Sequence, residues 1–101
     1  MKKTIFGFMN KNLNELTIII ESLDENFNSH DFIRKFEQKF TEEYVEFLNS
    51  YSDNREIKVH SQIARFLSKN KKILSIDKTN RVSSLNVHNR NSSVQGWKKV
   101  K

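Results

Sequence analysis

The chain has 101 residues, of which 36% are hydrophobic and eight are Phe, so it can form one domain with a modest core. The absence of Cys excludes a disulfide framework and a Cys-based zinc site. No apolar run approaches the roughly 18 residues needed to span a bilayer. The stretch after Lys2 and Lys3 is also too short for a signal peptide. We therefore expect a single cytoplasmic domain over 1–101 that makes no membrane contact.

The basic residues are concentrated in the second half of the chain. Residues 1–57 hold seven Lys or Arg against eleven acidic residues, a net charge of −4. Residues 58–101 hold eleven Lys or Arg against Asp77 alone, a net charge of +10. This division predicts a polyanionic partner for one face of the protein. A basic tail is the alternative, but the hydrophobic residues and the Trp of this half favour a folded unit.

The first part of the chain is predicted to be a helical support. We assign 1–10 to an N-terminal segment, 11–57 to the support and 58–101 to a basic unit. Leu and Ile at spacings of three and four predict a first helix over 11–23. The polar residues of 24–29 predict a turn.

The clearest helical pattern covers 30–51. Ser29 is expected to cap this helix, and Asp31 lies in the first turn, where the helix dipole favours an acid. Apolar residues follow at spacings of three or four. They are Ile33, Phe36, Phe40, Tyr44, Phe47 and Tyr51. We expect their aromatic rings to form the core rather than a platform for stacking bases.

The basic unit begins with a helix and ends with strands. A third helix is predicted over 59–69, because Ile63 and its apolar neighbours form one face. Residues 73–76 are rich in β-formers and 77–80 predict a turn. Residues 94–100 predict a last strand with its Trp facing inward.

The segment 61–67, Ser-Gln-Ile-Ala-Arg-Phe-Leu, resembles the first helix of many helix-turn-helix units. Ser61 would cap that helix, and the small Ala64 would let a second helix cross closely. Helices followed by a basic β-hairpin are also the order of winged-helix domains. The resemblance implies an α+β fold: a helical N-terminal part of two helices, and a C-terminal winged-helix-like unit made of a helix and a β-hairpin. It also implies DNA binding and transcription regulation.

The chain departs from this pattern after Leu67. A recognition helix is expected three or four residues later, where the sequence is β-branched and turn-rich. Either that helix is displaced to 80–89, or 81–87 is a strand and the preceding helix lies nearest DNA. The pattern slightly favours a displaced helix or an irregular segment. Residues 89–93 predict a flexible loop, and 88–91 are a candidate wing tip, although an ordinary polar hairpin loop is equally compatible with them.

Candidate nucleic-acid-binding side chains are of two kinds. Lysines neutralise phosphates without reading sequence, whereas Arg and Asn have the forked geometry that reads base edges. The predicted set is Gln62, Arg65, Lys69, Lys71, Lys72, Lys78, Arg81, Ser83, Asn86, His88, Asn89, Arg90, Asn91 and Lys98. Duplex DNA is the favoured partner, for a small regulator or an accessory protein of a phage or mobile element. A protein partner or a homodimer is the further possibility.

Signals for catalysis are weak. His30, His60 and His88 are too far apart for a local metal motif, although a His60/His88 pair would suit a small ribonuclease. The triplet 56–58 has the Glu-x-Lys form of some metal-dependent nucleases but lacks the preceding strand-borne Asp. We therefore expect no enzyme, no cofactor and no metal site.

Two other functions remain open at this stage. The first is a protein-interaction module or inhibitor that docks an acidic partner surface, or that uses its own acidic stretch 37–46. The second, a small metal-dependent nuclease or ribonuclease, is favoured less.

Overall fold

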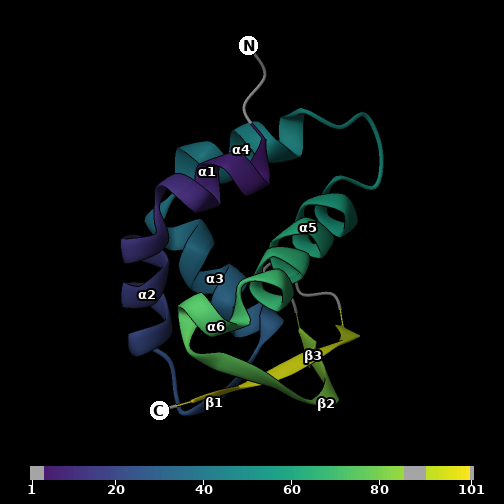
Figure 1. Cartoon of the computed structure of the whole chain (residues 1–101). Helices are drawn as coiled ribbons and strands as arrows, with labels where there is room; N and C mark the ends of the chain where they lie inside the picture. The colour runs from purple at the N-terminus through teal and green to yellow at the C-terminus, as the bar shows by residue number, and fades with distance from the viewer. Residues whose placement is uncertain (1–3, 86–90, 101) are drawn as a thin grey trace.

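The computed structural model describes residues 4–85 and 91–100, which form six helices and a three-stranded antiparallel sheet. The helices are α1 (Ile5–Lys11), α2 (Leu13–Glu21), α3 (Ser29–Lys39), α4 (Thr41–Asn49), α5 (Arg55–Lys69) and α6 (Lys71–Leu74). The strands are β1 (Asn26–Asn28), β2 (Ile76–Leu85) and β3 (Asn91–Lys99). Figure 1 shows the sheet at one end of the molecule and α1 and α4 at the opposite end. The predicted α+β class is confirmed.

Aromatic side chains bind the helices together around Phe8 of α1. The ring centroids of Phe36, Phe40 and Phe47 lie 6.1, 4.9 and 5.7 Å from that of Phe8, each with its edge toward a face. Such geometry is favourable beyond the area that it buries. Phe36 and Phe47 are buried, which confirms their predicted place in the core.

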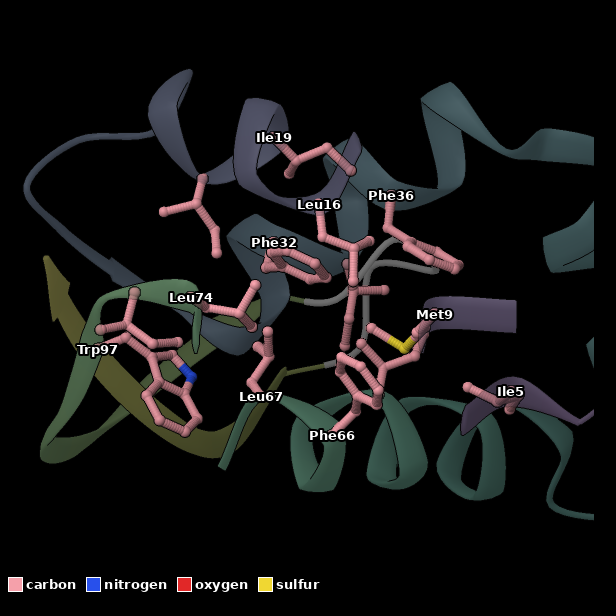
Figure 2. Close-up of a cluster of buried hydrophobic side chains, with 14 of the residues drawn as sticks. Ile5, Met9, Leu16, Ile19, Phe32, Phe36, Phe66, Leu67, Leu74 and Trp97 are labelled. Carbon is pink, nitrogen blue, oxygen red and sulfur yellow. The ribbon is translucent and has the colours of Figure 1, made fainter. Parts of the chain in front are cut away.

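Helix α1 lies in the segment to which the sequence assigns no element. Thr4 caps it, because its Oγ1 accepts a hydrogen bond of 3.0 Å from the backbone N–H of Gly7. Ile5 and Met9 are buried, at the end of the core cluster farthest from the sheet (Figure 2). The sequence hides this helix because it is only seven residues long and Gly7 is a poor helix former.

The predicted continuous helix over 30–51 is wrong, since α3 and α4 are separated at Phe40. Thr41 follows the break, and its hydroxyl donates to the carbonyl of Glu37 at 2.8 Å. A Thr bonded four residues back in this way bends a helix. The bend lets the aromatic rings of both helices reach Phe8, which a straight helix would not allow.

The cap of α3 also differs from the prediction. Asn28 rather than Ser29 is the N-cap: its Oδ1 accepts from the N–H of Asp31 at 2.9 Å, and the carboxylate of Asp31 accepts from the N–H of Asn28 at 3.0 Å. Two backbone donors at the helix start are thereby satisfied. Ser29 is instead buried inside the first turn.

A strand occupies part of the predicted turn over 24–29. β1 pairs antiparallel with β3, the strand order is β1-β3-β2, and Phe27 stands opposite Trp97. Both side chains are buried, which confirms the inward position of Trp97. The turn prediction failed because three residues are too few to show an alternating pattern. The sheet consequently joins the acidic and basic halves of the chain.

The first helix of the basic half is longer than predicted. α5 begins at Arg55 rather than at residue 59, so Ser61 lies inside it and caps nothing. The β-formers of 73–76 do not begin a strand at residue 73. Residues 71–74 instead form the helical turn α6, with Leu74 buried and Ile73 exposed.

Residues 76–85 are the strand β2, so a recognition helix displaced to 80–89 is wrong for its described part. The predicted turn over 77–80 lies inside the same strand. Backbone pairing with β3 holds β2 in place, and only Ile76 among its side chains is buried. Without a buried face the strand has no apolar pattern for the sequence to reveal.

A β-bulge interrupts β2 opposite Gly96. Lys78 faces Trp97 and Arg81 faces Gln95, so two residues of β2 stand opposite the single glycine. A Cβ on Gly96 would overlap the hydroxyl of Thr79 and lie 2.6 Å from the carbonyl oxygen of Asn80. The bulge therefore requires glycine at this position.

We predict that Gly96→Ala lowers the free energy of unfolding by about 1–3 kcal/mol, since the added methyl group forces the bulge apart. Urea denaturation monitored by Trp97 fluorescence measures the change. Gly7→Ala is the control: its Cβ would lie 2.8 Å from the exposed Thr4 hydroxyl that caps α1, which can rotate away, and Ala is the better helix former, so the net loss should be small. Equal losses in the two variants would contradict the requirement for glycine at the bulge.

Candidate functional site

A cavity of about 470 Å³ lies between α5 and the β2–β3 hairpin and is closed at one end by the first turn of α3. We call it the α5–hairpin cleft. In Figure 1 these elements meet at the sheet end of the molecule. Its volume falls within the roughly 300–1,000 Å³ that is usual for small-molecule sites.

Three cations converge on the cleft. Arg65 comes from α5, and Lys78 and Arg81 come from β2. Residues three apart on a regular strand would point to opposite faces. The bulge between Lys78 and Arg81 removes this difference, so both side chains line the cleft. Glu56 is the acidic lining residue among those described, which leaves an excess of positive charge.

The three cations differ in how firmly they are held. The Nε and one terminal nitrogen of Arg81 donate to the hydroxyl and the carbonyl of Ser93 at 3.1 and 2.6 Å, which orients the guanidinium across the hairpin. The side chains of Arg65 and Lys78 form no ion pair or hydrogen bond with residues that the structure describes. These two charges are available to an anionic partner.

His30 forms part of the wall at the start of α3 and is 3% exposed. Its Nε2 lies 3.4 Å from the hydroxyl of Ser92. Burial, followed by the positive charge of Arg34, lowers the pKa of His30 below its usual value. Asp31 and hydrogen bonds to the backbone of Leu85 and Ser84 oppose the shift only in part. His30 is therefore neutral at pH 7.

His60 of α5 also lines the cleft, but it has a structural partner. Its Nε2 lies 2.6 Å from the hydroxyl of Tyr44, and the two rings stack with centroids 5.9 Å apart. Burial raises the pKa of Tyr44, so the phenol keeps its proton. The pair links α4 to α5 and fixes the imidazole in the cleft wall.

A buried hydrogen-bond chain fixes the floor of the cleft to α3. The indole Nε1–H of Trp97 donates to the hydroxyl of Ser29 at 3.0 Å, and that hydroxyl donates to the carbonyl of Gln95 at 3.3 Å. All three residues line the cleft. The hairpin and the first turn of α3 are thus positioned by the same contact.

Of the fourteen predicted binding residues, the structure places Arg65, Lys78 and Arg81 in the cleft. Others serve the fold. Gln62 donates to the hydroxyl of Tyr51. The ammonium of Lys69 lies 5.9 Å from the ring centroid of Phe6, and Lys71 pairs with Asp77 at 3.7 Å.

Four further predicted residues, Lys72, Ser83, Asn91 and Lys98, do not line the cleft. Ser83 donates to the Oδ1 of Asn91 across the hairpin at 2.9 Å. Lys72 and Lys98 are exposed on α6 and β3. Asn86, His88, Asn89 and Arg90 lie outside the described residues, and with them the His60/His88 pair and the predicted wing tip except for Asn91. The predicted loop over 89–93 is wrong for 91–93, which belong to β3.

Sequence reasoning missed the histidines as members of one site. His30 and His60 lie on different helices, and only the packing of α3 against α5 brings both to the cleft. Within residues 4–85 and 91–100, no three His, Asp or Glu side chains group as a metal site would require. Among the helices of these same residues, none has the length and hydrophobicity to cross a membrane.

Comparison of the chain with known protein families, with curated proteins and with solved structures found no match.

We predict that the stability of the protein rises between about pH 5 and pH 7.5, in part through His30. The folded state disfavours the proton, so the unfolded state binds more protons below its pKa of 6.5. The contribution is complete above that value and is lost as the pH falls through the lowered pKa of the folded state. Urea denaturation at both pH values measures it. A His30→Asn variant with the same pH dependence as the parent would disprove the assignment.

Proposed function

We propose that this chain binds nucleic acid through the cationic surface that α5 and the hairpin form. The observation that carries the proposal is the convergence of Arg65, Lys78 and Arg81 on one cleft, within a half of the chain whose net charge is +10. Unpaired Lys and Arg side chains bind the phosphate backbone and release its counterions, which supplies affinity without sequence readout. Duplex DNA is the partner that we favour.

The order of the elements supports a winged-helix-like unit. Helices, a short strand, further helices and a β-hairpin follow one another, and the short strand β1 completes the sheet by pairing with β3. This is the order of a winged-helix domain. α5 then corresponds to the helix that lies on DNA, and the hairpin corresponds to the wing.

The charges along α5 indicate where the nucleic acid would lie. Asp53 and Glu56 are close to its N-terminal end, which in a helix-turn-helix unit meets the bases. Arg65 and Lys69 lie near its C-terminal end and are exposed, and Lys72 follows on α6. We therefore place the phosphate backbone over the C-terminal half of α5 and the adjacent hairpin. Contacts there would be mainly to phosphates.

The salt dependence of binding tests this proposal. For three phosphate contacts, affinity for a fluorescent duplex of random sequence should fall about 40-fold between about 50 and 200 mM salt. Arg65→Gln combined with Lys78→Gln should lower the slope of log affinity against log salt by about 2. Fluorescence anisotropy with duplex DNA, single-stranded DNA and RNA measures both quantities and ranks the partners.

Lys11→Gln combined with Lys35→Gln is the control, because it removes the same charge from exposed positions in the acidic half. This variant should keep the parental slope. If the protein fails to bind any of the three nucleic acids at low salt, the proposed function is wrong. If both double variants lower the slope equally, the binding surface is not the cleft.

A further inference from the structure

The α5–hairpin cleft is shaped for more than surface contact with a phosphate backbone. Its volume of about 470 Å³ is that of a small-ligand site, whereas a duplex can touch only its mouth. Its walls come from three separate parts of the chain, and the Trp97–Ser29 hydrogen bond joins two of them, β3 and α3. The cavity is therefore formed before any ligand arrives.

The polar lining selects an anion. Arg81 donates two of its five N–H groups to Ser93, and the others remain for a ligand. The side chains of Arg65 and Lys78 form no hydrogen bond or ion pair with a described residue. Ser61 and Ser68 add hydroxyl donors from α5. Arg, Lys and hydroxyl donors together match the oxygens of a phosphate group.

The part of the wall at the start of α3 favours a second, uncharged group on the ligand. His30 lines the cleft beside Ser92, and its Nε2 lies 3.4 Å from the Ser92 hydroxyl. A neutral imidazole can exchange a hydrogen bond with a hydroxyl group or with the edge of a base.

Apolar side chains complete the lining. Ala64 and Val94 are half-buried in the walls and Ile57, which is 61% exposed, lies at the cleft, whereas Ile33 and Trp97 are already buried by the protein. A fully hydrated ion such as inorganic phosphate gains nothing from this surface. A ligand that combines a phosphate with a flat apolar ring gains from both parts of the lining.

We propose that the α5–hairpin cleft binds one nucleoside phosphate unit, with its phosphate on Arg65, Lys78 and Arg81 and its base or sugar beside His30 and the apolar wall. The unit is either a free mononucleotide or an unpaired nucleotide of a nucleic acid. Only the second source rests on the proposed function above. The chemistry recognised by the cleft is the same for both.

Isothermal titration calorimetry with the four 5′-mononucleotides, adenosine and inorganic phosphate tests the proposal. At least one mononucleotide should bind about tenfold more tightly than either phosphate or the nucleoside, since these fill half of the site each. Equal affinity for inorganic phosphate and for all mononucleotides would overturn it, because the cleft would then be an unselective anion surface.

Variants locate the bound nucleotide. Arg65→Gln and Lys78→Gln should each weaken mononucleotide binding about tenfold, and thermal melts should show that both variants fold. Lys98→Gln removes the same charge from β3 outside the cleft and should leave the affinity within about twofold. Mononucleotide affinity that is unchanged in both cleft variants would place binding elsewhere and sink the proposal.

His30→Asn separates the two parts of the site. It should weaken mononucleotide binding while leaving the weak binding of inorganic phosphate unchanged, because His30 serves the neutral part of the ligand. If the His30→Asn variant binds mononucleotides as tightly as the parent does, His30 does not contact the base or sugar, and the cleft recognises only a plain anion.

A short single-stranded oligonucleotide distinguishes the two sources. Tighter binding than the mononucleotide, with the same loss in the Arg65→Gln and Lys78→Gln variants, identifies an unpaired nucleotide of a strand. Mononucleotide binding without any binding of oligonucleotide or duplex supports a free nucleotide and refutes the proposed function alone. Duplex binding without mononucleotide binding refutes the nucleotide site alone.

Discussion

The arrangement of this protein depends on the buried contact between Trp97 and Ser29. The indole N–H of Trp97 reaches the first turn of α3, while the strand that carries it pairs with β1 on one side and β2 on the other. Figure 2 shows Trp97 beside Leu74 and Leu67, at the sheet end of the core. Trp97 thus joins the sheet, α3 and the helical core, and together with the β1–β3 pairing it positions the hairpin.

The sheet and α3, held together in this way, bring to the candidate site side chains that no shared sequence motif relates. The bulge opposite Gly96 turns Lys78 and Arg81 to the same face of the hairpin, and Ser93 then orients the guanidinium of Arg81. α5 supplies Arg65 from the other side. The same β-bulge therefore explains why β3 requires glycine at position 96 and why both cations of β2 face the cleft.

Much of the positive charge of the second half serves the fold. Lys58 and Lys71 form ion pairs with Asp53 and Asp77, and Lys99 donates to backbone carbonyls at the end of α2. A cation near a helix C-terminus is stabilising there. Fewer charges are therefore available to a partner than the net charge of +10 suggests. The cations that lie close together are those at the cleft.

The sequence by itself determined the charge division, the α+β class, the aromatic core and the inward position of Trp97, because composition and helical periodicity record burial directly. It joined α3 and α4 into one continuous helix. It also missed β1 and the bulge, because these depend on pairing with residues far along the chain: Phe27 with Trp97, and the pair of residues Thr79 and Asn80 with Gly96. The site was partly predicted through Arg65, Lys78 and Arg81. Only tertiary packing decided that these three share a cleft with His30, since no local pattern relates a helix start, a helix middle and an edge strand.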